Sequence, residues 1–367
     1  MLAGEIRDKA MSLGFGDVGF ADVTPFAGGA EEMARRIRTE ASMRPVWERY
    51  RIASDPSAVM PGAKTVVVMA WPYAPYTGWP EGYLRWSAYY ECRIPARKAM
   101  AALVAWLRER GVTAVEDNDQ VPLKEAAVRA GLGTIGLNQL LITPEWGSCV
   151  YLGAVLIDRE ITERREPPKP LPCGKCQRCV KACPTNALEC DGTFTRQKCL
   201  RHHMLSGDTI PETVRGYLHN DLVGCDACQG VCPLNHGQYK GERSPEPDVV
   251  SPFSIAGVLD DWKTGLKARL ARMAPVIGAN YARADKVLAA ALIAARDCRE
   301  LTTSVGGALY HPRPHIRRYA AWALSLHGGE EAWTLLGDAL NRERDPAVIE
   351  EIKTALERRA DAGKDIK

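Results

Sequence analysis

Residues 173–184 read CGKCQRCVKACP, in which three cysteines are spaced by two residues and a fourth, three residues further on, precedes a proline. This spacing is typical of ferredoxin-like modules that bind two iron–sulfur clusters. The first three thiolates can wrap one cluster, whereas Cys183, the fourth, is positioned to ligate the other. Six further cysteines follow, of which Cys199, Cys225, Cys228 and Cys232 continue the pattern, whereas Cys190 and Cys298 fall outside it. The sequence therefore provides four ligands for each of two clusters.

We predict that the ligands cross between the two groups of cysteines. The first cluster is expected to bind Cys173, Cys176, Cys179 and Cys232. The second is expected to bind Cys183, Cys199, Cys225 and Cys228. A pair of zinc sites is the alternative, but zinc sites favour paired C-x2-C spacings over a triple followed by Cys-Pro. Two adjacent 4Fe-4S clusters would relay electrons at potentials of about −400 mV.

The composition is that of an ordinary globular protein. The chain has 367 residues, of which 46% are hydrophobic and 25% charged, and its formal net charge is only +3. This near balance argues against a protein coated in basic charge for nucleic acid. No run reaches the roughly 18 apolar residues of a membrane span, and residues 1–13 predict an amphipathic helix rather than a signal peptide. We expect a cytoplasmic protein whose clustered cysteines bind metal rather than form disulfides.

Two charged, proline-rich linkers, residues 163–172 and 236–252, divide the chain. Neither can continue a helix or a central strand. We therefore predict three domains: residues 1–162, a double-cluster ferredoxin-like domain at 163–243, and a helical domain at 244–367. The fold class expected for the whole chain is α+β.

The first domain alternates strand and helix signals. Residues 65–71 and 150–157 are apolar runs typical of buried strands, and residues 112–115 predict a short third strand. Helices are expected at 95–110, which starts with proline, and at 122–130, which a glycine ends. The pattern is α/β or α+β, and periodicity alone does not choose the topology.

The third domain is predicted to be helical throughout, and it carries a faint repeat. Pro314 and Ile316 recur 32 residues later as Pro346 and Val348. Helix pairs at about this period are typical of HEAT-like helical repeats.

The same domain contains the conspicuous basic patch of the chain, formed by His311, Arg313, His315, Arg317 and Arg318. Such a patch can grip phosphate. A solvated helix start explains it about as well.

From about Met60 to Asn235 the sequence resembles the epoxyqueuosine reductase family, cobalamin-dependent enzymes that complete queuosine in transfer RNA. The matching motifs are MPGAK at 60–64, AGLG at 130–133 followed by Gly136-x-Asn138, LITPEWGS at 141–148, YLG at 151–153 and GCDxCQxVCPxN at 224–235. The cobalamin-dependent reductive dehalogenases look like more distant relatives, because they share the AGLG and LLITPEWG stretches and the two clusters.

The resemblance implies a corrinoid, cobalamin, bound by an N-terminal α/β domain of nitroreductase-like fold, close to the nearer cluster. The residues expected to bind it are Gly131, Leu132, Gly133, Gly136, Asn138, Gly147, Ser148 and Tyr151. Glycines let the backbone approach a large flat ligand closely. A helix cap followed by a turn is the alternative explanation of the glycines in residues 130–136.

The resemblance also implies an acid that protonates the substrate. Counting back from Ala130 places this acid at Asp117, with Asp119 as a substitute. A protein acid that delivers a proton at neutral pH needs a pKa raised by burial or by a like charge. A solvated acidic turn is the alternative. Tyr90 is a further candidate donor by analogy with the dehalogenases, although such tyrosine pairs more often serve packing.

Three segments depart from the family pattern. Thr134 and Leu137 replace an aromatic and a basic residue, and residues 87–92 and the segment near Arg283 keep little of the pattern. These positions would lie near the cofactor mouth or the substrate face. They therefore bear on the substrate more than on the cofactor.

Together, the motifs predict an oxidoreductase that uses two 4Fe-4S clusters and a corrinoid to reduce epoxyqueuosine to queuosine in transfer RNA. An external low-potential donor would reduce the clusters. One alternative is the same cofactor chemistry on a small molecule, as reductive dehalogenation or deoxygenation. Another is an electron carrier that reactivates a partner's corrinoid. We expect a monomer that has no membrane partner.

Overall fold

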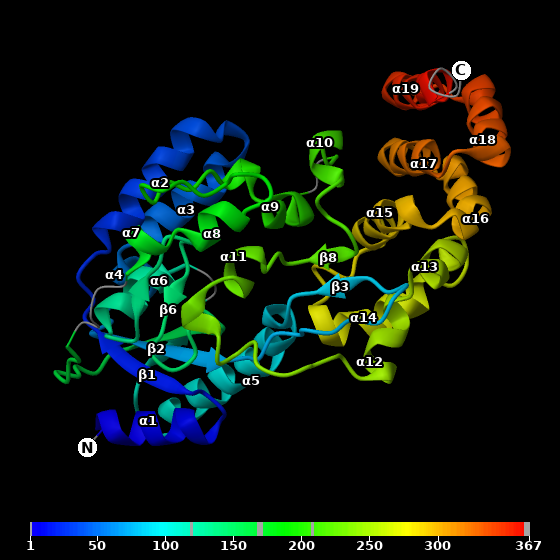
Figure 1. Ribbon diagram of the computed structural model, residues 1–367. Helices are drawn as coiled ribbons and strands as arrows, with labels where there is room; N and C mark the ends of the chain where they lie inside the picture. Colours follow the sequence, from blue (N-terminus) through cyan, green and yellow to red (C-terminus); the bar gives the residue numbers. More distant parts are fainter. Residues whose placement is uncertain (1, 118–119, 167–171, 207–208, 363–367) are drawn as a thin grey trace. The chain divides into compact units, whose positions relative to one another are not determined.

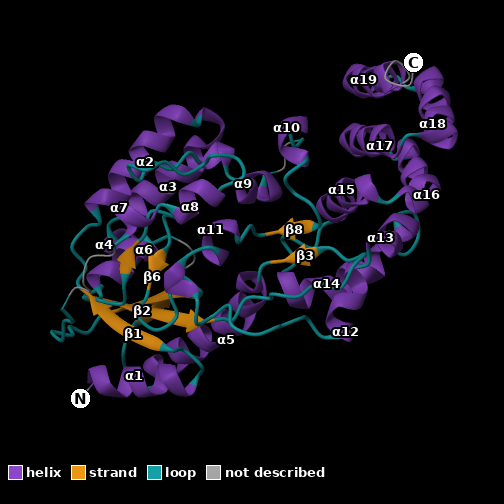
Figure 2. Cartoon of the chain, in the orientation of Figure 1, coloured by secondary structure: helices purple, strands orange, loops and turns teal. Residues whose placement is uncertain are grey.

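The structure is a computed structural model that describes residues 2–117, 120–166, 172–206 and 209–362 (Figures 1 and 2). The chain forms two compact units, each assembled from three stretches of sequence. Unit 1 comprises residues 1–75, 92–194 and 226–240, and unit 2 comprises residues 76–91, 195–225 and 241–367. Both units thus take part of the segment 163–243 that carries the cysteine motifs.

Unit 1 is built on a four-stranded antiparallel sheet with the strand order β1-β2-β7-β4. The strands are β1 (Asp17–Ala21), β2 (Thr65–Pro72), β4 (Ala114–Glu116) and β7 (Val150–Ile157), drawn in orange in Figure 2. β2 and β7 pair along their whole length, from Thr65 opposite Ile157 to Pro72 opposite Val150. These two strands are the longest apolar runs of the sheet, which accounts for their central place.

Helices cover both faces of this sheet. α6 (Leu123–Arg129) packs on β1, β2 and β7, and its alanines share a core with Val68 and Ala154. Gly153, the residue before Ala154 in β7, faces the opposite side of the sheet because successive strand residues alternate between the two faces. There α5 (Ala88–Arg108) brings Met100 so close that a Cβ on Gly153 would lie 2.2 Å from its sulfur.

The other elements of unit 1 are mostly short helices. They are α1 (Leu2–Ser12), α2 (Ala27–Thr39), α3 (Arg44–Ala53), α4 (Pro56–Val59), the strand pair β5 (Thr134–Ile135) and β6 (Leu141–Ile142), and, in the cysteine motifs, α7 (Cys173–Cys176), α8 (Arg178–Ala182) and α11 (Ala227–Gly230).

The predicted amphipathic first helix and the strands at 65–71 and 150–157 are confirmed, as is the helix ended by a glycine, since Gly131 follows α6 with φ at +75°. The short strand β4 begins two residues later and ends one residue later than predicted. The expected start of α5 at Pro95 was wrong, because the helix begins at Ala88 and contains Pro95. The Ser87 hydroxyl accepts the Tyr89 N–H at 3.3 Å, so this serine starts the helix earlier.

Unit 2 is helical except for the parallel pair β3 (Arg85–Trp86) and β8 (Asp221–Val223). Its helices are α9 (Leu200–Leu205), α10 (Glu212–Arg215), α12 (Pro247–Val250), α13 (Ile255–Asp261), α14 (Leu266–Ile277), α15 (Ala284–Ala294), α16 (Thr302–Gly307), α17 (Pro314–His327), α18 (Gly329–Arg342) and α19 (Pro346–Ala362). α17 and α19, which carry the predicted repeat, pack on each other (Figure 1). Within the described residues, no helix combines the length and the apolar character needed to cross a membrane.

One hydrophobic core of unit 2 extends from these helices into the segment between Cys199 and Cys225. It includes Leu200 and Met204 of α9, Leu222 of β8, and Leu292 of α15. Cys225 is partly buried against the same core. This shared core explains why contacts join residues 195–225 to the helical region.

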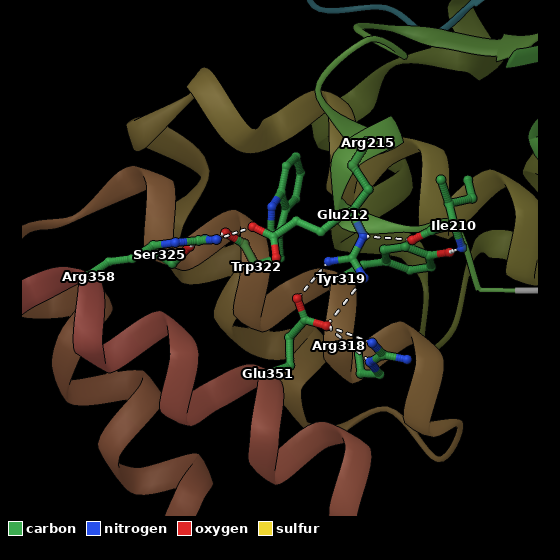
Figure 3. Close-up of polar contacts among 9 residues, drawn as sticks. All are labelled: Ile210, Glu212, Arg215, Arg318, Tyr319, Trp322, Ser325, Glu351 and Arg358. Carbon is green, nitrogen blue, oxygen red and sulfur yellow. Dashed lines mark hydrogen bonds and ion pairs between the residues drawn. The ribbon is translucent and has the colours of Figure 1, made fainter. Parts of the chain in front are cut away.

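A buried ion-pair network reinforces this join (Figure 3). Arg215, only 1% exposed, donates to both oxygens of Glu351 at 2.8 and 3.3 Å and to the Ile210 carbonyl at 3.0 Å. Arg318 donates to the same carboxylate at 3.0 Å. The guanidinium of Arg215 also lies over the Tyr319 ring, 4.9 Å from its centre. Glu351 of α19 therefore binds two arginines at once, although its single negative charge offsets only one of their two positive charges.

The same contacts correct the expected phosphate grip of Arg317 and Arg318. Arg317 forms a bidentate pair with Glu343 at 2.6 and 2.8 Å and donates to the carbonyls of His311 and Pro312. The pair and two backbone N–H donors hold the pKa of Glu343 low, at about 2. Arg317 is therefore structural, because Glu343 matches its charge, whereas Arg318 shares Glu351 with the buried Arg215.

We predict that Glu351→Gln destabilises unit 2 by roughly 3 kcal/mol, because it leaves Arg215 buried without a counter-charge. Urea unfolding followed by far-UV circular dichroism under anaerobic conditions measures the change. Glu350→Gln is the matched control, since Glu350 is the exposed neighbour on the same helix. An equal effect of the two substitutions would contradict the structural role of the network.

Candidate functional site

The four predicted ligands of the first cluster line one pocket of unit 1. Cys173 and Cys176 begin and end α7, Cys179 lies in α8, and Cys232 directly precedes a 3-10 turn. Gln177, with φ at +50°, reverses the chain between α7 and α8. A tight double turn and one distant cysteine thus converge on the same space.

The pocket has the electrostatics of a site that needs a cation. Burial raises the pKa of Cys179 and of Cys232, and neighbouring cysteine charges raise both further, against opposing backbone hydrogen bonds. For Cys232 the neighbours are Cys173 and Cys176. Thiolates crowded in this way are stabilised by positively charged iron.

Tyr239 adds a polar group that suits an iron–sulfur cluster. Its hydroxyl is buried and has no hydrogen-bond partner among the described residues. Burial raises its pKa, and the nearby charges of Asp226, Cys149 and the ligand cysteines raise it further. An isolated hydroxyl beside cysteine ligands fits a sulfur acceptor, because hydrogen bonds to sulfur are a common feature of such clusters.

A buried polar network fixes the second cysteine motif to the loop that precedes β7. Asn235, fully buried, accepts the Ser148 N–H at 2.7 Å and donates to the Ser148 hydroxyl at 2.8 Å. That hydroxyl donates to Gln229 at 2.9 Å, which also accepts from Tyr73 at 3.3 Å. Gly147 has φ at +55°, and a Cβ there would overlap the Asn235 amide. The network therefore positions Cys228 and Cys232.

The predicted ligands of the second cluster are divided between the units. Cys183 and Cys228 belong to unit 1, where the Cys183 sulfur accepts the Ala187 N–H at 3.2 Å. Cys199 and Cys225 belong to unit 2, where Cys199 caps α9 and Cys225 follows Gly224. Gly224 is required there, since a Cβ would lie 2.5 Å from that of Ser87. That these four cysteines bind one cluster stays a prediction.

Two of the residues expected to bind the corrinoid, Gly136 and Asn138, line the pocket of the first four cysteines. The others face protein. Gly131 packs on Arg165 and Gly133 on the Ile142 carbonyl, and Leu132, Ser148 and Tyr151 are at least 95% buried, with exposures of 0%, 5% and 3%. The helix cap and turn therefore account for part of the glycine pattern, and contact with a corrinoid stays a prediction.

Asp117 is held in one orientation at the end of β4. It is 4% exposed, and one carboxylate oxygen accepts the N–H groups of Gln120 and Val121, both at 2.9 Å. Its own N–H donates to the Ala154 carbonyl at 2.9 Å. Asp117 is thus a buried, oriented acid rather than part of a solvated turn. Asp119 lies outside the described residues.

Tyr90 lies in unit 2, within an aromatic cluster. It is 1% exposed, its ring centre is 4.8 Å from that of Tyr281, and its hydroxyl accepts from Arg201 at 2.9 Å. Burial raises the pKa of Tyr90, and Arg201 opposes the rise. A raised pKa makes the phenol a poorer proton donor, and the contacts favour a packing role.

Sequence reasoning assigned no role to Tyr73, Gln229, Asn235 or Tyr239, which surround the ligand cysteines. Asn235 had a signal, since it follows the second Cys-Pro pair at fixed spacing. Tyr73 lies far from the cysteines in sequence, so that only the folded chain shows its contact with Gln229.

Comparison with protein families shows a match over residues 172–235 to the 4Fe-4S double cluster binding domain. This is the segment that contains all eight predicted ligands. The chain therefore carries a double-cluster binding domain.

Comparison with individual proteins shows similarity to several epoxyqueuosine reductases. That of Listeria monocytogenes is 35% identical over 277 residues, 70% of this chain and 68% of the relative. That of Gloeobacter violaceus is 34% identical over 69% of this chain and 81% of its own length. That of Bacillus cereus is 29% identical over 94% of both chains.

Solved structures share the fold. An epoxyqueuosine reductase with an epoxyqueuosine-modified tRNA-Tyr stem loop superposes with a TM-score of 0.84 and 24% identity, covering 97% of this chain and 98% of that chain. The enzyme from Streptococcus thermophilus gives a TM-score of 0.80 with 22% identity, covering 97% and 99%.

We predict that pairs of cysteine substitutions distinguish crossed from uncrossed ligation. Cys179→Ala with Cys232→Ala removes ligands of one cluster only, and leaves about four irons per chain. Cys179→Ala with Cys183→Ala removes one ligand from each cluster and leaves almost no iron in the chain. Iron content after anaerobic reconstitution measures both. The reverse order of the two results would establish uncrossed ligation.

Proposed function

The chain belongs to the epoxyqueuosine reductase family, and we propose that it reduces epoxyqueuosine to queuosine in transfer RNA with electrons relayed through two 4Fe-4S clusters. One observation carries this proposal: Gly136 and Asn138 line the same pocket as the four cysteines of the first cluster. The loop expected to hold the redox cofactor thereby forms a wall of the cluster site. Electrons from the cluster would cross only this wall.

The cofactor proposed for the reaction is a corrinoid, as in the family. When bound, it supplies the low-potential chemistry that opens a carbon–oxygen bond. Gly136 and Asn138 are the residues proposed to contact it, because they line the cysteine pocket while the remaining matched residues are packed against protein. Those packed residues support the loop from behind: Gly133 lies on the Ile142 carbonyl, and Ser148 is tied to Asn235.

Asp117 is proposed to deliver the proton that the product needs. Burial keeps this carboxyl away from bulk water, and the N–H groups of Gln120 and Val121 fix one of its oxygens. A fixed donor avoids the entropy cost of orienting a mobile side chain at each turnover. Electrons would come from an external low-potential donor, and a cytoplasmic location would give access to transfer RNA.

We predict that Asp117→Asn lowers product formation at least 10²-fold, because the amide keeps both hydrogen bonds but cannot supply a carboxylic proton. Mass spectrometry of nucleosides from epoxyqueuosine-containing transfer RNA, incubated with reductant and cobalamin, measures the loss.

Glu116→Gln is the matched control. Glu116 is the preceding residue and pairs with Arg97 at 3.4 Å, so its substitution changes the same charge nearby. Activity should remain within a few-fold of the wild type. Comparable losses in both variants would reject Asp117 as the donor, and no queuosine from the wild type would reject the proposed function.

A further inference from the structure

A cationic pocket lies within unit 2, and no cysteine is among the residues that line it. Its walls are α9, β8, α15 and α17, and its volume is about 220 Å3. Basic side chains gather in it: Arg283, Lys286, Arg313, His203 and His315. This volume admits a phosphate group.

Two of these cations have no carboxylate partner. Neither Arg283 nor Lys286 forms an ion pair with any described residue. Lys286 is half-buried and donates to the carbonyls of Leu205 at 2.6 Å and Met204 at 3.4 Å, so one N–H remains for the pocket. Burial lowers the pKa of Lys286, and the charge of Arg283 lowers it further.

The acidic residues of the pocket do not cancel this charge. Asp285 is paired with Arg313, and Asp221 with Arg85 at 3.0 Å. Both carboxylates therefore already face an arginine. The pocket retains the charges of Arg283 and Lys286, which an anion would offset.

The remaining donors are arranged around the same space. Arg283 and Arg313 are the N-caps of α15 and α17, and neither helix has a side-chain cap. Two helix N-termini therefore direct their positive ends toward the pocket wall. The Tyr319 hydroxyl accepts the Ile210 N–H at 2.7 Å, which leaves its own proton available (Figure 3).

We propose that this pocket binds a backbone phosphate of the RNA substrate, with Arg283 and Lys286 as its principal cations. The assignment rests on the proposed function, since RNA is the phosphate-bearing molecule that the enzyme must hold. The pocket replaces the surface patch expected from the sequence, because Arg317 and Arg318 are used in internal ion pairs. Only Arg313 and His315 of that patch line it.

The test is the affinity of the cluster-loaded full-length chain for a fluorescent tRNA anticodon stem loop, measured by anisotropy over a salt series. Arg283→Gln with Lys286→Met removes both charges while retaining most side-chain volume. We expect binding to weaken roughly tenfold or more, and the slope of log K against log salt to fall by about one, because one phosphate contact is lost.

Lys267→Met with Arg272→Gln is the matched control, because it removes the same two charges from exposed positions on α14. Its affinity and salt slope should stay near those of the wild type. Thermal unfolding and iron content establish that both variants are folded. Equal behaviour of the pocket and control variants would overturn the proposal.

A second titration with inorganic pyrophosphate identifies the source of the phosphate. Competition with the stem loop in the wild type, lost in the pocket variant, supports an RNA phosphate site. Pyrophosphate binding without any effect on the stem loop would overturn that assignment in favour of a free phosphate compound. If the pocket variant loses RNA affinity although the wild type makes no queuosine, the proposed reaction fails and the binding site stands.

Discussion

The structure depends on one constraint: Cys232 must return to the pocket formed by Cys173, Cys176 and Cys179. A turn at Gln177 brings the first three together locally, but the fourth comes from a separate stretch of unit 1. Asn235 makes the return possible, since it binds Ser148 through both its side-chain oxygen and nitrogen. Removing those contacts would leave buried polar groups unsatisfied, at a cost of about 1–3 kcal/mol each.

The two units contribute different parts of the proposed enzyme. Unit 1 supplies the sheet, the oriented Asp117 and the first cluster pocket. Unit 2 holds Cys199 and Cys225 on a helical core that the Arg215–Glu351 pair closes. The helical region is therefore part of the scaffold for the second cluster's predicted ligands. It also contains the cationic pocket, so that one unit would combine support of the second cluster with the proposed binding of an RNA phosphate.

Much of this arrangement was predictable from the sequence, and the failures have physical causes. The strands β2 and β7 and the cysteine groups follow from local spacing. The start of α5 was misplaced because the Ser87 hydroxyl, rather than Pro95, begins the helix. Arg317 and Arg318 look available in the sequence, yet their ion-pair partners Glu343 and Glu351 lie later in the chain. The positions of the Tyr239 hydroxyl and of Lys286 likewise cannot be read from the sequence, because distant segments of the chain surround them.

We propose that the first cluster adjoins the cofactor loop and supplies it with electrons. Electron paramagnetic resonance of the reduced protein with bound cobalamin tests this directly, by measuring the magnetic interaction between the cluster and paramagnetic cobalt. We predict that the cobalt signal is broadened or split in the wild type. The broadening or splitting should disappear when Cys179 and Cys232 are both replaced by alanine. A cobalt signal that is the same with and without the first cluster would contradict it.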